Sequence, residues 1–145
     1  MKYLFISIEI VVIVILSSCF NVVEHNHANY AFQAQKFVIE AIALEDQLNE
    51  DGKEDEYISL MKKAVQESKY AKRTELNGLY KNWGDMFHDY LIIGAKLTIE
   101  GYNESDAQIS FKKFSEATDH IIKYSDWFNE HASNMEKELE KNKNK

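Results

Sequence analysis

The chain has 145 residues, a net charge of −7, five glycines, no proline and one cysteine. This length suits a single compact domain, and the acidic balance argues against a nucleic-acid-binding surface, which needs basic side chains to neutralise phosphates. The lone cysteine excludes an intramolecular disulfide. The absence of proline favours long helices joined by short connections.

The N-terminal segment has the pattern of a targeting sequence. A basic head, Lys2, is followed by an apolar run over residues 3–15, and a Leu-Ser-Ser-Cys motif at residues 16–19 ends the run. This motif resembles the signal peptide of bacterial lipoproteins, in which a leucine and two small residues precede an acylated cysteine. The resemblance implies a signal peptide over residues 1–18 and lipidation of Cys19. It covers only these first residues, and no family is recognised for the rest of the chain.

Two alternatives to lipidation stay open. Residues 3–23 are long enough to span a bilayer as an uncleaved anchor, and Glu9 interrupts the apolar run. An ordinary secretory signal is the other alternative. In each case the remainder leaves the cytoplasm, so we expect a cell-membrane protein facing the periplasm or the cell exterior. In lipoproteins an Asp after the cysteine marks inner-membrane retention, so Phe20 favours the outer membrane.

The first part of the domain is predicted as a tether followed by a helix. Residues 19–29 are polar and irregular, and from Tyr30 apolar residues recur at alternating spacings of four and three, which places them on one helical stripe. The stripe comprises Tyr30, Ala34, Phe37, Ala41, Leu44 and Leu48. Gly52 lies where this helix is expected to end.

The middle of the chain is predicted as two helices, over residues 54–76 and 79–101. The apolar pattern shifts by one residue beside Asn77 and Gly78, and Asn-Gly is a strong turn dipeptide. One continuous helix over residues 54–101 is the alternative. The second stripe of this region contains Leu76, Tyr80, Trp83, Phe87, Tyr90, Gly94, Leu97 and Gly101.

The last helix is predicted to begin at Ala107, with Ser105 as its N-cap and Gln108 completing a capping box. Its stripe is the most regular of the chain and contains Ala107, Phe111, Phe114, Thr118, Ile121, Ser125, Phe128, Ala132, Met135 and Leu139. Residues 141–145 have nothing to bury and are expected to fray. Residues 30–140 therefore form the predicted domain, an all-α, antiparallel up-down four-helix bundle.

Four side chains are candidates for a metal or small-ligand site. Bundles hold di-metal centres with Glu and Glu-x-x-His motifs that face inward. The nearest pattern here comprises Asp85, His88, Glu116 and His120. Both histidines lie beside the stripes rather than on them, so hydrogen bonding near the surface is the simpler interpretation. A metal- or ligand-binding bundle is the alternative function.

Nothing in the sequence predicts an enzyme. There is no nucleophile elbow or phosphate-binding glycine loop, and the carboxylates fall on faces expected to be solvated. We expect no cofactor and no catalytic residue.

Exposed aromatic side chains favour a protein-binding role. Tyr124 and Trp127 share one side of the last helix, and Tyr and Trp are common interface anchors. Burial within the core is the alternative for both rings. We expect a non-enzymatic helical module that is held at the membrane by its lipid and binds a protein partner in the cell envelope. In size, anchor and helicity it resembles secretion pilotins, immunity lipoproteins and exclusion lipoproteins.

Overall fold

A computed structural model describes residues 26–143, and every element in this range is helical, which confirms the all-α class. In chain order the elements are α1 (Asn26–Ile42), the 3-10 turn η2 (Glu45–Gln47), α2 (Lys53–Ser68), α3 (Arg73–Leu79), α4 (Trp83–Met86), the π-helix η3 (Phe87–Ile92), α5 (Ile93–Asn103) and α6 (Ala107–Lys143). The predicted signal peptide, Cys19 and Glu9 lie outside the described residues.

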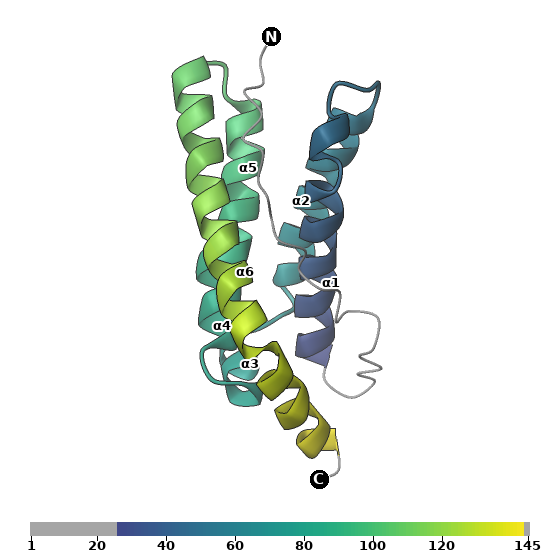
Figure 1. Cartoon of the computed structure of the whole chain (residues 1–145), viewed down its shortest axis with the longest axis vertical. Coiled ribbons are helices and arrows are strands. Elements are labelled where there is room, and N and C mark those ends of the chain that lie inside the picture. The colour runs from purple at the N-terminus through teal and green to yellow at the C-terminus, as the bar shows by residue number, and fades with distance from the viewer. Residues whose placement is uncertain (1–25, 144–145) are drawn as a thin grey trace.

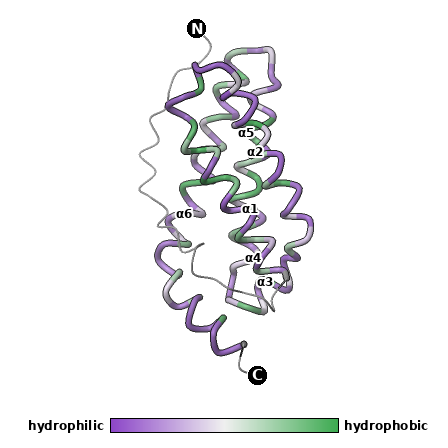
Figure 2. The backbone as a smooth tube through the Cα atoms, turned by 90° about the vertical axis from the view of Figure 1, so that its right-hand side faces the viewer, coloured by the Kyte–Doolittle hydropathy of each residue, from purple (hydrophilic) through white to green (hydrophobic). Residues whose placement is uncertain are grey.

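The helices associate as two pairs that share one core. α1 packs along α2, α5 packs along α6, and α2 contacts α5 (Figure 1). The short helices α3 and α4 lie at the end of the molecule where α1 begins. Hydrophilic and hydrophobic residues alternate along the helices, whereas the last turns of α6 are mainly hydrophilic (Figure 2).

The two pairs are joined by a polar contact inside the core. The Tyr124 hydroxyl donates a hydrogen bond of 2.9 Å to Oε1 of Gln35, and both side chains are buried. Phe32 of α1 and Phe128 of α6 make an edge-to-face ring contact, with centroids 6.5 Å apart. The α1–α2 pair is therefore fixed on the α5–α6 pair by one directional bond and by aromatic packing.

Small residues let α1 lie close to its neighbours. Its buried apolar residues are Ala28, Ala31, Ala34, Val38 and Ala41, all at most 1% exposed.

The core stripe of α1 is therefore shifted from the predicted one, because Tyr30 and Phe37 lie on its flank. α1 also begins at Asn26 and ends at Ile42, so residues 26–29, predicted as part of the tether, are helical, and Leu44 and Leu48 follow the helix. The rest of the predicted tether lies outside the described residues.

The predicted break at Asn77 and Gly78 is wrong, as is the alternative of one continuous helix. Both residues lie inside α3, and the chain turns instead over residues 69–72 and 80–82. Asn82 adopts a left-handed conformation, with φ 64°, directly before α4. Asn77 contributes to this second corner, because its Oδ1 accepts a hydrogen bond from the Gly84 N–H at 2.7 Å. The Asn side chain therefore caps the next helix instead of ending its own.

A π-helical segment lies within the third long helix. This helix consists of α4, η3 and α5, which follow one another without a break from Trp83 to Asn103. After Phe87 the core takes Leu91 and Thr98 instead of the predicted Tyr90 and Leu97. Gly94 and Gly101 are buried as predicted. A π-turn accommodates one extra residue.

The start of α6 is capped by a different residue from the one predicted. Oδ1 of Asp106 accepts hydrogen bonds from the N–H groups of Gln108, at 2.9 Å, and Ile109, at 3.0 Å. Asp106 is thus the N-cap, and Ser105 is not. Residues 141–143, which were predicted to fray, are helical, because α6 continues to Lys143. Residues 144 and 145 lie outside the described residues.

Gly84 is expected to be indispensable at the corner between α3 and α4. A Cβ atom there would lie 2.1 Å from the backbone oxygen of Arg73, whereas a Cβ at Gly78 would meet nothing within 4 Å. We expect Gly84→Ala to lower the free energy of unfolding by about 2–3 kcal/mol or more. Gly78→Ala, inside α3, should instead raise it by up to about 1 kcal/mol.

Urea unfolding followed by circular dichroism measures both variants. Equal stability of the two alanine variants would contradict the close approach at Gly84.

Candidate functional site

The predicted metal-binding residues are engaged in other contacts. Asp85 and His88 come from α4 and η3, whereas Glu116 and His120 come from α6. Within residues 26–143 no group of three or more His, Cys, Asp or Glu side chains is placed to hold a metal ion. The four residues instead divide between a polar network around Arg73 and the surface of α6.

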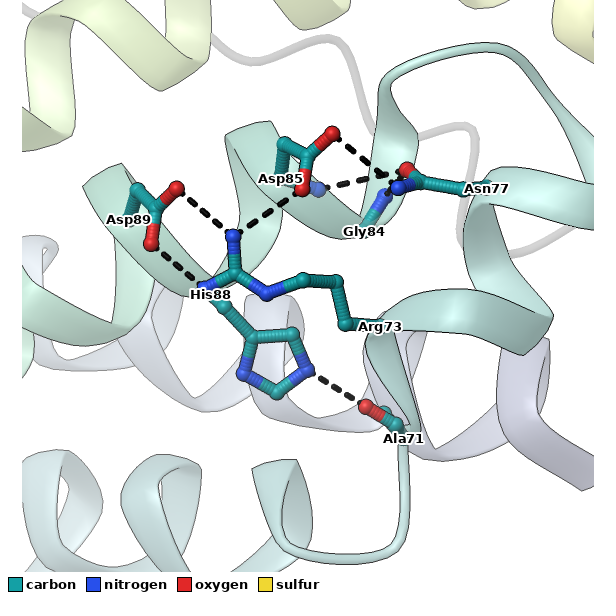
Figure 3. A network of polar contacts seen from close by, with 7 residues as sticks. All are labelled: Ala71, Arg73, Asn77, Gly84, Asp85, His88 and Asp89. Atoms are coloured by element: carbon teal, nitrogen blue, oxygen red, sulfur yellow. Dashed lines mark hydrogen bonds and ion pairs between the residues drawn. The ribbon is translucent and has the colours of Figure 1, made fainter.

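Arg73 is the centre of the polar network (Figure 3). Its Nη1 donates to Oδ1 of Asp85 at 3.0 Å and to Oδ2 of Asp89 at 2.7 Å, and its Nη2 donates to the other oxygen of Asp89. Asn77 donates from Nδ2 to Oδ2 of Asp85 at 3.0 Å. The guanidinium hydrogen bonds lower the pKa of the Asp89 carboxyl, so this side chain stays ionised. The network ties α3 to α4 and η3.

His88 contacts the same corner through the backbone. Its Nε2 lies 2.5 Å from the carbonyl oxygen of Ala71, and because a carbonyl only accepts, Nε2 carries the proton. Burial lowers the pKa of His88, and the nearby Arg73 lowers it further, although the Ala71 hydrogen bond acts in the opposite direction. His88 is therefore a neutral donor that holds the turn after α2.

Glu116 and His120 lie on α6 and bond locally. Nδ1 of His120 donates to the carbonyl oxygen of Glu116 at 2.8 Å, one turn earlier in the same helix. The His120 ring also lies 5.8 Å from the Tyr90 ring, and the Glu116 carboxylate lies 3.8 Å from Nζ of Lys112. This matches the simpler interpretation of His120 as a surface hydrogen-bonding residue.

The prediction that Tyr124 and Trp127 form an exposed patch is wrong for Tyr124. Tyr124 is 0% exposed, and Trp127 is only half-buried, with its ring 4.9 Å from that of His131 and 6.2 Å from that of Tyr80. Burial raises the pKa of the Tyr124 hydroxyl, which stays protonated and donates to Gln35. The spacing of apolar residues in α6 is consistent with the burial of Tyr124, because it lies three residues after Ile121 and four before Phe128, both buried.

Exposed apolar side chains occur instead on the first half of α6. Phe111 is 49% exposed, Ile109 48% and Ile122 39%. Phe111 and Ile122 are about three turns apart on one line of the helix, with Ser115 and Thr118 between them, whereas Ile109 lies on nearly the opposite side. We call the line Phe111, Ser115, Thr118 and Ile122 the α6 stripe.

The sequence pattern assigned Phe111 to the core, but α5 does not cover it. α5 approaches α6 at Gly101, where a Cβ atom would lie 3.2–3.4 Å from Lys113, Ser110 and Phe114. The residues that face α5 therefore precede and follow Phe111, which points about 100° away from Ser110, about 160° away from Lys113 and about 60° away from Phe114 around the helix axis. The α6 stripe therefore has an exposed apolar side chain at each end, Phe111 and Ile122.

A half-buried carboxyl forms a second polar cluster where α1 is connected to α2. Glu45 of η2 is hydrogen-bonded to the hydroxyl of Tyr57, which in turn contacts Thr98 of α5. Burial raises the pKa of Glu45 to about 7, although the Tyr57 hydrogen bond acts in the opposite direction and Asp46 adds to the rise. The carboxyl is therefore half-titrated near neutral pH.

No protein-family model matches the chain, and comparison with characterised proteins and with solved structures finds no match either. Among the helices of residues 26–143, none combines the length and the apolar character that crossing a bilayer requires.

The raised pKa of Glu45 predicts a pH-dependent stability. Because the folded state binds this proton more tightly than the unfolded chain, whose Glu has a pKa near 4.5, the unfolding free energy should fall as the pH rises from about 4.5 to about 7. Glu45→Gln should remove about 1–3 kcal/mol of this decline.

Thermal unfolding at several pH values measures the effect. Asp46→Asn, at an exposed position next to Glu45, is the matched control and should leave most of the decline in place. An unchanged pH profile in Glu45→Gln would contradict the assignment.

Proposed function

We propose that this chain is a bacterial lipoprotein, anchored by lipid on Cys19 in the outer membrane, whose helical domain binds a protein partner in the cell envelope. The function is non-enzymatic and of the pilotin, immunity or exclusion type. The Leu-Ser-Ser-Cys motif at residues 16–19 supports the anchor. The exposed α6 stripe supports the binding role.

The start of α1 supports a domain that is held close to its membrane. α1 begins at Asn26, and the segment from Cys19 to that residue spans at most about 25 Å when fully extended. A partner of this domain would therefore be met within a few tens of ångströms of the lipid surface.

The α6 stripe is the observation that carries the binding proposal. Phe111 and Ile122 expose large apolar side chains along one line of the longest helix, which has 37 residues. An apolar line on a helix is complementary to a hydrophobic groove or to a second amphipathic helix. Thr118, between the two, bonds its hydroxyl to the Phe114 carbonyl at 2.9 Å, so it adds a methyl group rather than an unsatisfied polar atom.

The contacts among the helices support a more specific architecture, the up-down four-helix bundle. Its members would be α1, α2, the continuous helix over residues 83–103, and α6. α1 packs on α2, α2 on α5, and α5 on α6, while the Tyr124–Gln35 bond connects α6 back to α1. Each member thus touches two neighbours, as in a closed four-helix arrangement.

If Cys19 carries the lipid anchor, the mass of the mature chain should include the acyl groups. Cys19→Ala should abolish acylation and release the domain from the membrane fraction, because the domain carries a net negative charge and has no comparable attraction to anionic lipid. Intact mass spectrometry of the membrane-extracted chain measures the added acyl mass and the loss of residues 1–18. Ser18→Ala, which keeps a small residue before the cysteine, is the matched control and should stay lipidated.

If the α6 stripe binds the partner, probes on that side of α6 should contact the partner and probes on the opposite side should not. A photo-crosslinking amino acid at Phe111 or Ile122 should give the same crosslinked product in intact cells. The same probe at Ile109, which is equally exposed on the opposite side of α6, should give at least about tenfold less, since hot-spot contacts are confined to one patch.

Phe111→Ser should reduce crosslinking from position 122 without changing the circular dichroism spectrum. Equal products from positions 109, 111 and 122 would contradict a binding surface on the α6 stripe.

A further inference from the structure

An exposed aromatic pair lies where α1 begins. The rings of Tyr30 in α1 and Tyr70 in the turn after α2 are 5.1 Å apart, and they are 36% and 55% exposed. Nδ1 of His27 donates to the backbone oxygen of Tyr70 at 2.8 Å, which holds the turn against the first turns of α1. Two tyrosines are therefore fixed side by side on the surface from which the N-terminal segment leaves the domain.

Two lysines flank this pair. Lys69 and Lys72 are exposed, and neither takes part in an ion pair within the part of the chain that the structure describes. The next residue, Arg73, is paired with two carboxylates, Asp85 and Asp89, so these three side chains together carry a net charge of −1. The turn over residues 69–72 contains no acidic residue, so it carries a local positive charge although the whole chain is negative.

This surface lies at the opposite end of the molecule from the start of α6. Figure 1 shows α1 beginning beside α3 at one end, whereas α5 is connected to α6 at the other. The short segment between Cys19 and Asn26 therefore leads from the lipid to the end that carries Tyr70. Phe111, in the second turn of α6, belongs to the far end.

We propose that Tyr30, Tyr70, Lys69 and Lys72 form a membrane-contacting surface that rests in the headgroup layer of an anionic phospholipid bilayer. This inference depends on the proposed lipid anchor. Tyrosine rings favour the membrane–water interface because one edge is apolar and the hydroxyl is polar. Lysines next to them are attracted to anionic headgroups within a Debye length of the surface.

The contact sets the orientation of a domain that is already anchored. Two lysines and two tyrosines are too few to recruit an acidic protein from solution, but the lipid on Cys19 holds the surface at high effective concentration near the bilayer. With the Tyr70 end on the lipid, the first turns of α6 point away from the membrane. The α6 stripe is then presented toward partners at a distance from the bilayer.

The test uses the full chain, extracted with its lipid and reconstituted into vesicles of phosphatidylcholine and phosphatidylglycerol that contain a lipid with a nitroxide on its headgroup. A fluorescent maleimide is attached to Thr74→Cys in α3, or to Ser105→Cys in the turn before α6, both exposed positions. We expect the label at residue 74 to be quenched about twofold or more relative to the label at residue 105.

Charge and ring variants distinguish this contact from simple proximity to the anchor. Lys69→Glu with Lys72→Glu, or Tyr30→Ser with Tyr70→Ser, should remove most of the difference between the two labels. Lys62→Glu with Lys63→Glu, an exposed pair within α2, changes the net charge equally and should leave the difference intact. In vesicles of phosphatidylcholine alone, the effect of the lysine variants should disappear.

The outcomes separate the two proposals. Equal quenching at residues 74 and 105 in a chain whose mass shows acylated Cys19 overturns the membrane-contacting surface and leaves the anchor standing. An unmodified Cys19, visible as a second labelled thiol, overturns the anchor and this inference with it. Unchanged quenching in both double variants also overturns the proposed contact.

Discussion

The hydrogen bond between Tyr124 and Gln35 is the contact on which the relation of the two helix pairs depends. Apolar packing is non-directional, so two pairs of amphipathic helices could slide or rotate against each other with little change in buried area. A buried hydroxyl that must reach one amide oxygen has no such freedom, because an unpaired polar atom in the core costs about 1–3 kcal/mol. The bond therefore fixes the register between α1 and α6, and with it the positions of both proposed surfaces relative to one another.

Much of the fold could be predicted from periodicity, and the errors have local causes. The last helix was predicted from Ala107 and is observed from Ala107, because its stripe is regular over many turns. The break in the middle was misplaced, because Asn77 and Gly78 have turn propensity, whereas α3 uses the Asn side chain to cap α4. The corner at Gly84 depends on a close backbone approach to Arg73, and no sequence pattern encodes such a distance.

The candidate sites were less predictable than the helices. A spacing of three or four residues shows that two side chains share a face, but not which face a neighbouring helix covers. Phe111 illustrates this, since the pattern assigned it to the core and the structure exposes it. For Tyr124 the sequence left both exposure and burial open, and the structure buries it. The local positive turn beside Tyr70 was hidden because net charge averages over the whole chain. Both proposed surfaces required the arrangement of the helices in space.

The π-helical segment over Phe87–Ile92 has a consequence for how this sequence can change length. A single-residue deletion inside an α-helix rotates everything beyond it by about 100° and moves the buried face into solvent. A π-turn already holds one residue more than an α-turn, so a loss there would restore regular α-helix without rotating α5, and Thr98 would stay buried. The segment is therefore the place in the third long helix where a deletion would be tolerated in evolution.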